Sequence, residues 1–344
     1  MFIKRILPAL LLTALITGSF SCIDDPPTHA EVSDFQSSVE LVWELYDQKY
    51  VGFPDKSVDW DAVHAEYSQR AEGLSTTPET QALITEMIGE LQDRSALVND
   101  ASSWLPEDYF ENVDPDTLES ILSAWNFIWD DTLSRYWGSC NIDSLHYINV
   151  RDFYFFFTAQ ALSENIQNNL DARGMILDLR ISTGTSLVPA EQITGYFAEE
   201  NMTAFLTRHR TGPDHDDLSP LEPHTVSPRT WAYTRPVVVL TGQQTIGPAE
   251  AFASAMGSMS HVTIIGDTTG GGGNTPGFFN QRNWVALPGI MVTCPFSTVL
   301  AADTSLIEGR GVPCDIYVHV TEGDILAGED PVLDYAIDYL GSRS

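Results

Sequence analysis

Two turns in the sequence place small and polar residues directly after short apolar runs, where α/β proteins carry out their chemistry. Residues 177–185 read Leu-Asp-Leu-Arg-Ile-Ser-Thr-Gly-Thr, and residues 239–250 read Val-Leu-Thr-Gly-Gln-Gln-Thr-Ile-Gly-Pro-Ala-Glu. A helix that begins at such a turn presents unpaired N–H groups and the positive end of its dipole, which stabilise a nucleophile or an oxyanion. Taken singly, each turn is also what an ordinary strand end looks like. Neither holds the Gly-Lys-Ser/Thr of a phosphate-binding loop.

The segments around these turns alternate between strand-like and helix-like patterns. We expect strands at 147–150, 175–179, 237–240 and 262–266, and helices at 153–170, 189–197 and 248–259. Strands that alternate with helices predict βαβ units and a largely parallel sheet, so the fold class is α/β. Residues 206–235 contain four Pro and three His and are expected to form an exposed excursion.

The chain divides into regions of different pattern. Residues 34–97 form an amino-terminal helical region: apolar residues recur at helical spacing over 35–50, Asp59 can cap a second helix, and Thr76 or Thr77 begins a third. Residues 98–145, rich in Trp, Asp and Ser, are expected to be an irregular connecting segment. Residues 146–344 form the α/β domain.

Composition sets limits on the class of protein and its partners. The chain has 344 residues, of which 43% are hydrophobic, so it can bury a core and is not disordered. Lys plus Arg is 17 and Asp plus Glu is 48, which gives a net charge of −31. A surface that acidic repels phosphate backbones, so no nucleic-acid partner is expected.

The first residues resemble an export signal rather than part of the fold. In residues 1–21, Lys4 and Arg5 precede an apolar run over 6–16 that is too short to span a bilayer comfortably. The small residue before Cys22 resembles a bacterial lipoprotein cleavage site, although Ser19 replaces the usual aliphatic residue. We therefore expect a lipid on Cys22, a tether over 22–33, and a protein of the cell envelope anchored to a membrane. Plain secretion is the alternative.

The remaining cysteines, Cys140, Cys294 and Cys314, do not suggest a site. Their number is odd, so at most one internal disulfide can form, and their spacing matches no metal site. Small buried side chains are a better interpretation than nucleophiles. No motif for a metal or an organic cofactor is present, so no cofactor is expected.

The order of several motifs resembles the tail-specific, or C-terminal processing, serine peptidase family, in its tricorn-core-like branch. In the amino-terminal region, Asp59-Trp60-Asp61-Ala62-Val63 resembles the family's helical lead-in, and residues 91–95 lie where the family has Leu-x-Asp-Gly-His. In the α/β domain, Asp178-Leu179-Arg180 through Gly184 resembles Asp-Leu-Arg-x-Asn-x-Gly-Gly, and residues 245–250, ending in Glu250, resemble Thr-x-Ser-x-x-Glu. The loop 266–272, with Gly270 and Gly271, resembles Gly-Glu-x-Thr-Gly-Gly, and residues 307–316 resemble Glu-Gly-x-Gly-Val-x-Pro-Asp-Ile. Each motif is weak alone, but their shared order makes the resemblance specific.

The resemblance implies a ClpP/crotonase-like peptidase core: a parallel-rich sheet with flanking helices, preceded by a small helical region. The connecting segment is too short for the PDZ domain that many relatives insert. The implied chemistry is acyl transfer on a polypeptide, in which a Ser attacks the carbonyl, a His takes its proton and a Glu orients the His. Glu308 is at the Glu position, while Gly184, Gly247 and Pro248 lie where the family binds the peptide and its oxyanion.

Two decisive positions depart from the family pattern. The nucleophile position holds Gly247, and the His position holds Ser95 after Arg94, a permanent cation. The family's alternative Lys base has no substitute, since no Lys follows Lys56. A triad without its nucleophile loses most of its rate. The sequence therefore predicts a peptidase fold with weak or lost hydrolysis.

Three functions stay open at this point. Thr245 or Ser254, with His261 or His209 as base, could sustain an atypical serine-type peptidase. A non-catalytic pseudopeptidase could still bind an extended peptide by strand addition at a sheet edge. The Trp-rich segment 104–137 raises a carbohydrate- or partner-binding surface, although packing is the better interpretation of those side chains.

Overall fold

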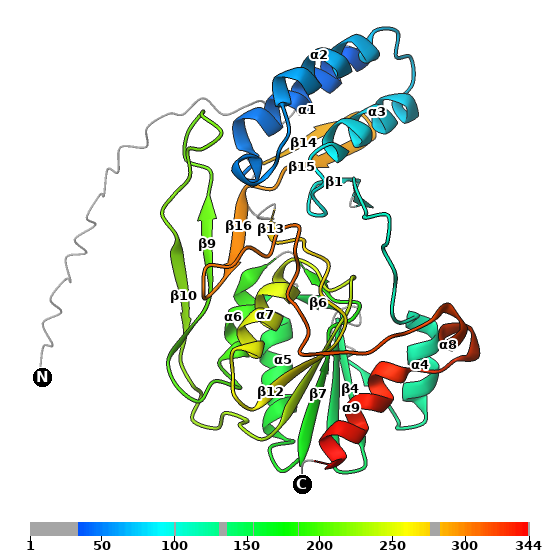
Figure 1. Ribbon diagram of the computed structural model, residues 1–344, viewed down its shortest axis with the longest axis vertical. Coiled ribbons are helices and arrows are strands. Elements are labelled where there is room, and N and C mark those ends of the chain that lie inside the picture. The colour runs from blue at the N-terminus through cyan, green and yellow to red at the C-terminus, as the bar shows by residue number, and fades with distance from the viewer. Residues whose placement is uncertain are drawn as a thin grey trace, which may run out of the picture.

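The computed structural model describes residues 34–99, 101–130, 136–153, 155–184, 186–275 and 283–342. The expected signal peptide, the lipidation site at Cys22 and most of the tether lie outside these residues. The described chain forms two parts, which we call the helical unit and the α/β unit; the helical unit lies above the α/β unit in Figure 1.

The helical unit begins with the predicted helices, α1 (Phe35–Lys49), α2 (Trp60–Ala71) and α3 (Thr77–Gly89). Each begins where a side chain accepts a hydrogen bond from a backbone N–H of the first turn, from Asp34, Asp59 and Thr76 respectively. A short 3₁₀ turn, η1 (Phe53–Asp55), connects α1 to α2. The predicted caps at Asp59 and Thr76 are confirmed.

A hairpin from the far end of the sequence completes the helical unit. Its strands β14 (Trp284–Leu287) and β15 (Ile290–Thr293) pair in the order β14-β15-β1-β2 with β1 (Leu97–Val98) and β2 (Ala101–Ser102). Side chains of the hairpin and of all three helices share one hydrophobic cluster. Figure 1 shows the orange hairpin against the blue helices. Sequence analysis placed only residues 34–97 in this region, because nothing local marks the hairpin as its partner.

The α/β unit is built on a sheet that has seven strands in the described chain, in the order β17-β12-β11-β7-β5-β4-β3. The strands are β3 (Ile128–Trp129), β4 (Trp137–Ile142), β5 (Leu145–Val150), β7 (Gly174–Asp178), β11 (Val237–Thr241), β12 (Val262–Gly266) and β17 (Ile316–Tyr317). From β5 to β17 the neighbours are parallel, and β4 and β3 add antiparallel pairs at one edge. The predicted parallel-rich α/β fold is confirmed.

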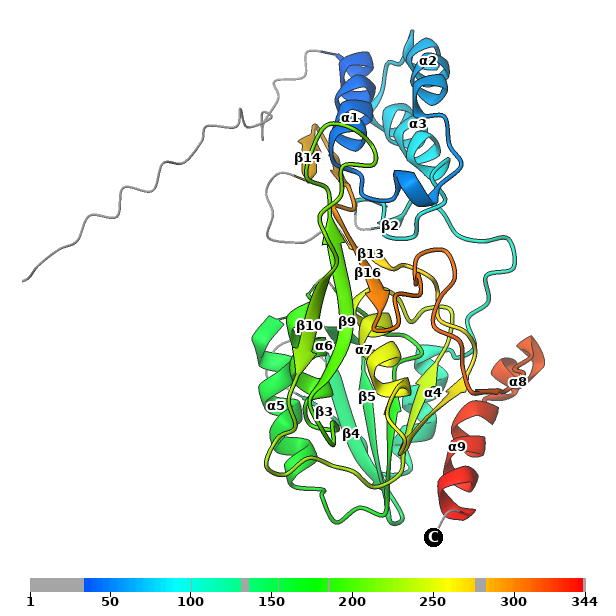
Figure 2. The same ribbon diagram turned by 60° about the vertical axis from the view of Figure 1, so that its left-hand side comes forward.

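Helices cover both faces of this sheet (Figures 1 and 2). The helices of the first face are α5 (Phe155–Gln167), α6 (Leu187–Thr194) and α7 (Pro248–Gly257); those of the other are α4 (Pro115–Ser123) and α9 (Pro331–Ser342), which follows α8 (Glu322–Ala327). Val237 and Val239 pack toward the first face and Val238 and Leu240 toward the second, as the alternation of a strand requires. The continuous apolar runs of the sequence reflect this burial on both faces.

Two segments are more regular than their sequences predict. Residues 206–235, expected as an exposed excursion, overlap β9 (Met202–His209) and contain β10 (Glu222–Val226), which pair in the sheet β10-β9-β16-β13 with β16 (Ser297–Ala301) and β13 (Asn274–Thr275). Pro223 is tolerated because β10 is an edge strand. Residues 98–145, expected to be irregular, include α4 and β4.

The loop between β9 and β10 holds the helical unit. Arg210 is 4% exposed, and its guanidinium donates to the backbone carbonyls of Asp47 and Tyr50 at 3.0 and 2.7 Å, and to two carbonyls of its own loop. His215 bonds to Asp47 at 2.8 Å and stacks on Phe53. These contacts join the end of α1 and η1 to the α/β unit.

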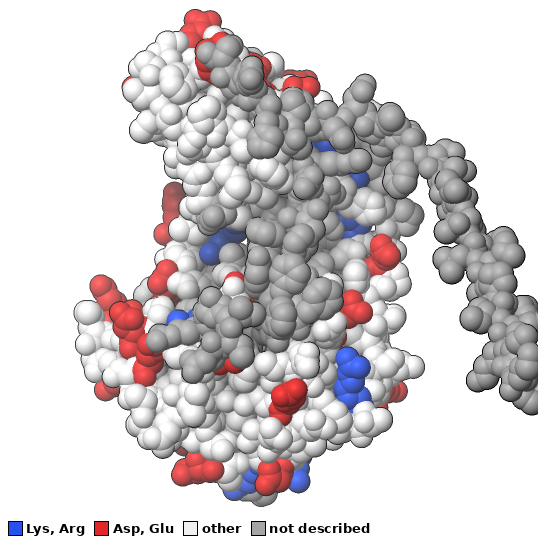
Figure 3. All heavy atoms as spheres, turned by 180° about the vertical axis from the view of Figure 1, so that it is seen from behind, with Lys and Arg blue, Asp and Glu red and all other residues white. Residues whose placement is uncertain are grey.

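The cysteines, the helices and the surface charge were also considered from the sequence. Cys140 and Cys294 are buried, Cys314 is partly buried, and all three are free thiols. Over the described residues, none of the helices combines the length and apolar character needed to cross a membrane. On the face opposite to Figure 1, charged groups are scattered and separated by uncharged surface (Figure 3).

A buried ion network ties α9 to the end of β7. Arg180 is 1% exposed and pairs with Asp178 and Asp330, each through a contact of 2.7 Å. Asp330 also accepts the backbone N–H of Leu333 in the first turn of α9. Because these hydrogen bonds satisfy a charge removed from water, loss of one partner leaves the others uncompensated.

We expect Asp330→Asn to lower the free energy of unfolding by about 2–3 kcal/mol, because it removes one charge from a buried pair. Urea denaturation measures the difference. Asp338→Asn, an exposed position of the same helix, is the matched control and should change stability by less than about 0.5 kcal/mol. Equal effects of the two variants would contradict a stabilising role for the network.

Candidate active site

The elbow between β11 and α7 holds Gly247 in a conformation that favours glycine. Its backbone has φ +65° and ψ −127°, and it is the N-cap residue of α7. The elbow is fixed by Thr245, whose hydroxyl donates to the carbonyl of Leu179 at 2.7 Å and accepts the N–H of Gly242. A Cβ at position 247 would meet only the carbonyl oxygen of Gly184, at 3.6 Å. The space for a nucleophilic side chain is therefore present beside the Gly184 turn.

Glu250 connects the elbow to the glycine-rich loop. Its buried carboxylate accepts the backbone N–H of Gly247 at 3.0 Å, the N–H of Gly271 at 2.7 Å and the hydroxyl of Thr269 at 2.6 Å. Burial raises the pKa of Glu250 to about 7, although these hydrogen bonds act in the opposite direction. The close approach of two backbone segments to one carboxylate explains the need for glycine here.

The hydrogen-bond donors of the elbow are already used or missing. The N–H of Gly247 is engaged by Glu250, and Pro248 has no N–H. The expected role of Pro248 in oxyanion binding cannot therefore be that of a donor. Gly184 remains the candidate donor from the neighbouring turn.

Ser95 reaches the elbow from the helical unit. Its hydroxyl donates to the carbonyl of Gly272 at 3.2 Å, and its backbone N–H donates to Asp93 at 2.8 Å. A Cβ on Gly272 would lie 3.3 Å from both the Ser95 Oγ and the Cβ of Ile246. The fold therefore brings Ser95 close to Ile246, the residue before Gly247, with Gly272 next to both.

Glu308 completes the site together with Lys56, a residue to which sequence reasoning assigned no role. Glu308 is 4% exposed; one oxygen pairs with Lys56 Nζ at 2.8 Å and the other accepts the N–H of Asn274 at 3.1 Å. Lys56 lies just after η1 and also donates to the carbonyl of Gln92. The carboxyl group that the resemblance assigns to the orienting position thus has an ammonium group as its partner.

A second buried carboxylate lies close by. Asp93 is fully buried and accepts hydrogen bonds from the Tyr50 hydroxyl and the Asn274 amide, both at 2.8 Å. Burial, followed by the nearby charge of Asp93, raises the pKa of Glu308 to about 8, while Lys56 acts to lower it. No signal in the local sequence could have paired Lys56 with Glu308, because they are far apart in the chain.

The alternative catalytic residues are not assembled at the elbow. The Thr245 hydroxyl is buried and used to hold the turn. His261 lies at the amino-terminal end of β12, whereas the elbow follows the carboxyl end of the parallel strand β11, and the neighbour of His261 is Glu199 at 3.8 Å. His209 belongs to β9 and stacks on Phe296. Ser254 lies within α7, past the first turn.

The Trp-rich segment is largely packed. Trp137 is 7% exposed, and Trp129 lies under the guanidinium of Arg151 at 4.2 Å and edge-on to Phe127. These contacts favour a structural role over carbohydrate binding. In the described residues, no group of three or more His, Cys, Asp or Glu side chains could hold a metal ion.

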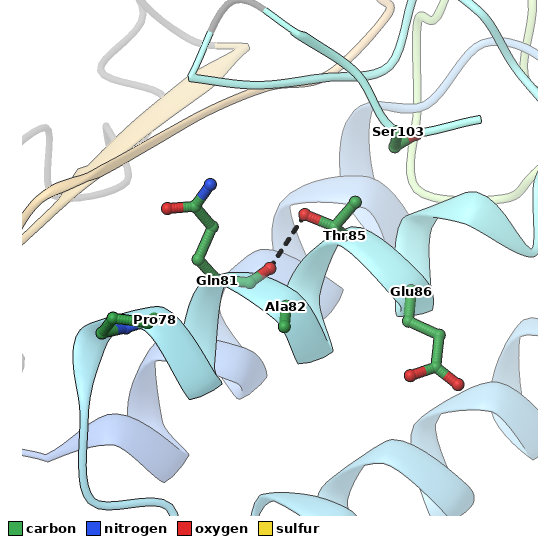
Figure 4. A pocket seen from close by; sticks show the side chains of 6 residues that line it. All are labelled: Pro78, Gln81, Ala82, Thr85, Glu86 and Ser103. Atoms are coloured by element: carbon green, nitrogen blue, oxygen red, sulfur yellow. Dashed lines mark hydrogen bonds between the residues drawn. The ribbon is translucent and has the colours of Figure 1, made fainter. Parts of the chain in front are cut away.

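An open hollow of about 480 Å³ lies along α3, away from the elbow residues (Figure 4). Its lining residues are Pro78, Gln81, Ala82, Thr85, Glu86 and Ser103. Within it, the Thr85 hydroxyl donates to the backbone of Gln81, and Glu86 pairs with Arg70 of α2 at 2.5 Å. It offers no reactive group.

The raised pKa of Glu308 predicts a pH dependence of stability. Between its ordinary value of 4.5 and about 8, the folded chain keeps a proton that the unfolded chain releases, so stability falls as pH rises through this range. Glu308→Gln should remove this contribution and flatten the dependence by up to about 1.4 kcal/mol per pH unit. Urea denaturation from pH 5 to 8 measures it.

Glu322→Gln, at an exposed position, is the control for that experiment and should keep the wild-type slope. A Glu308→Gln slope that is indistinguishable from wild type would show that Glu308 is ionised throughout this range.

Comparisons with known proteins identify the family of this chain. The model of Peptidase family S41 matches residues 144–318, and that of the Tricorn protease C1 domain matches residues 33–89. The chain is 24% identical over 240 residues to the tricorn protease of Thermoplasma acidophilum. That match covers 65% of this chain but 20% of the relative, so the chain spans about a fifth of its length.

Solved structures share the fold over most of the chain. A protein described as a candidate peptidase from Parabacteroides merdae has a TM-score of 0.72 at 24% identity, over 89% of this chain and 96% of that one. Mature CPAF complexed with lactacystin has a TM-score of 0.65 at 12% identity, over 90% and 97%. A lipoprotein from Streptococcus agalactiae has a TM-score of 0.56 at 13% identity, over 90% of this chain and 97% of that one. Because the S41 model matches half of the sequence, this chain belongs to peptidase family S41, the tail-specific serine peptidases, in their tricorn-like branch.

Proposed function

We propose that this member of peptidase family S41 binds polypeptide segments without hydrolysing them at an appreciable rate. The observation that carries the proposal is Gly247, which occupies the elbow in front of α7 where a nucleophile would stand. Glycine has no side chain to attack a carbonyl.

Other residues of the site also lack the groups that peptide hydrolysis requires. Ser95, beside the elbow, has no affinity for a proton near neutral pH, and Pro248 removes one backbone donor that would stabilise an oxyanion. Glu308 is held by Lys56 rather than by an imidazole. Since members of a catalytic triad act as a unit, restoring any one alone recovers little rate.

The frame that would hold a peptide is nevertheless retained. Burying Glu250 is costly, yet it still connects the elbow and the glycine-rich loop through its hydrogen bonds. The Gly184 turn still meets the elbow, and its short strand β8 (Thr183–Gly184) pairs with β6 (Asp152–Phe153). An extended polypeptide could join such an edge through backbone hydrogen bonds.

Reactivity with a fluorophosphonate probe tests the loss of hydrolysis. We expect no labelled Ser or Thr in the wild-type protein and no cleavage of a casein substrate, because no activated hydroxyl is present. The double variant Ser95→His with Gly247→Ser should gain labelling at position 247, found by peptide mass mapping. Ser95→Ala with Gly247→Ala is the matched control and should stay unlabelled.

Labelling of any wild-type Ser or Thr, together with cleavage that is lost when that residue becomes Ala, would instead establish the surviving, atypical peptidase. Retained peptide binding without labelling would support the pseudopeptidase.

We also propose that the protein is exported and anchored to a membrane of the cell envelope through a lipid on Cys22. The support is the basic start, the short apolar run and the small residue before Cys22; the S. agalactiae lipoprotein shows that this fold occurs in a protein so described. Two acyl chains would provide a stable anchor.

Fractionation of bacterial cells that express the full chain tests the anchor. Wild-type protein should sediment with membranes and incorporate labelled palmitate, whereas Cys22→Ala should do neither. Cys140→Ala is the control and should behave as wild type. Wild-type protein found in the soluble fraction without label would favour plain secretion.

A further inference from the structure

Arg94, the residue before Ser95, is a buried cation without a carboxylate partner. It is 4% exposed, and its contacts are the carbonyls of Gln243 and Gly270, both reached through Nη1, and the ring of Tyr109, 5.0 Å from its Cζ. Its Nε is shielded from solvent and has no hydrogen-bond partner. Among the described side chains it forms no ion pair. Since the guanidinium is always protonated, this charge is permanent.

The two other buried arginines discussed above show what a satisfied guanidinium looks like in this chain. Arg180 is bound by two carboxylates, and Arg210 donates to four carbonyls. Arg94 forms its hydrogen bonds through Nη1 alone, and its buried Nε has no partner. Burying a charge in this state is costly unless a further partner of opposite charge is supplied.

Arg94 lies beside the elbow. Gln243 precedes the elbow by only a few residues, and a Cβ on Gly270 would collide with both the Arg94 guanidinium and Ile246. Ile246 in turn directly precedes Gly247. A ligand placed over the elbow would therefore have the guanidinium next to it.

We propose that Arg94 binds a carboxylate of the polypeptide ligand, as the anchor of a site that has lost its reacting groups. A guanidinium N–H donates a charge-assisted hydrogen bond to a carboxylate, which is stronger than a hydrogen bond to a neutral acceptor. The carboxylate comes from an acidic side chain or from the carboxyl terminus of the ligand. The proposal rests on the proposed peptide-binding function, and adds that the site prefers peptides that carry a carboxylate.

Paired peptides that differ only in one carboxylate test the proposal. Acetylated hexaalanine with a free carboxyl terminus is compared with its amide, and an acetylated, amidated alanine peptide with one central Glu is compared with its Gln counterpart. We expect at least one acid to bind the wild-type protein about 10- to 100-fold more tightly than its neutral partner. The pair that shows the preference identifies the source of the carboxylate.

Arg94→Gln should abolish that preference, and the affinity of the variant for the neutral peptides is the reference that corrects for any change in the loops that Arg94 holds. Arg94→Lys keeps the charge but loses the planar fork, so an intermediate preference is expected. Arg229→Gln is the matched control, since Arg229 is exposed and lies 5.4 Å over the ring of Tyr196; it should keep the full preference. Acids and amides weakened equally by Arg94→Gln, or no preference in wild type, would overturn the proposal.

Acetate, the simplest carboxylate, separates failure of this proposal from failure of the proposed function. Sodium acetate should raise the Tm of wild type above that in sodium chloride at equal ionic strength, and the increase should be absent in Arg94→Gln. If no peptide binds but acetate acts through Arg94, peptide binding fails and the carboxylate site stands. An acetate effect that is absent from wild type, or equal in both proteins, would overturn the site.

Discussion

A buried carboxylate is stable only where something offsets its charge, and this protein buries several where its two units meet. Asp93, Glu250 and Glu308 are each shielded from water. Asp93 and its partner Tyr50 come from the helical unit, whereas Glu308 and Asn274 come from the rest of the chain. Lys56 crosses the boundary to reach Glu308. Because buried carboxyl groups need hydrogen-bond partners, and these partners come from both units, the junction fixes how the two units lie against each other.

The hydrogen bonds around these residues are compatible with the proposed loss of hydrolysis in a site that keeps its shape. A nucleophile can be replaced by glycine at little cost to the elbow, since Thr245 and Glu250 hold the turn through their own hydrogen bonds. The buried Glu308 carboxyl group also has a partner for each oxygen, Lys56 Nζ for one and the N–H of Asn274 for the other. It therefore needs no imidazole to complete its hydrogen bonds.

Sequence patterns predicted the parts of the fold that depend on neighbours in the chain. The apolar run ending at Asp178, and the one that precedes Thr241, are buried strands because alternate residues face opposite layers of helices. The caps Asp59 and Thr76 follow from local hydrogen bonding. The motif order was sufficient for the family. Residues 211–235 are largely exposed, as expected, but the strand β10 within them was not predicted, because Pro223 and His224 obscure the alternation of an edge strand.

Contacts between remote residues could not be predicted in this way. Nothing in the sequence around Lys56 indicates that it contacts Glu308. The environment of Arg94 is likewise set by remote residues, the carbonyl of Gly270 and the ring of Tyr109. Such pairs depend on how whole helices and strands pack together, which the spacing of residues along the chain does not indicate. The positions of Ser95 and Gly247 were placed by resemblance, and their common location is a property of the folded chain.

The hairpin β14–β15 has a consequence for how the chain acquires its structure. The three amino-terminal helices share their hydrophobic cluster with Val285, Ile290 and Val292, so they cannot close that cluster until synthesis has passed these positions. Contacts between such distant segments form slowly, because the long intervening loop must first be closed. The leading part of the nascent polypeptide therefore stays without its complete hydrophobic cluster while most of the chain is being made.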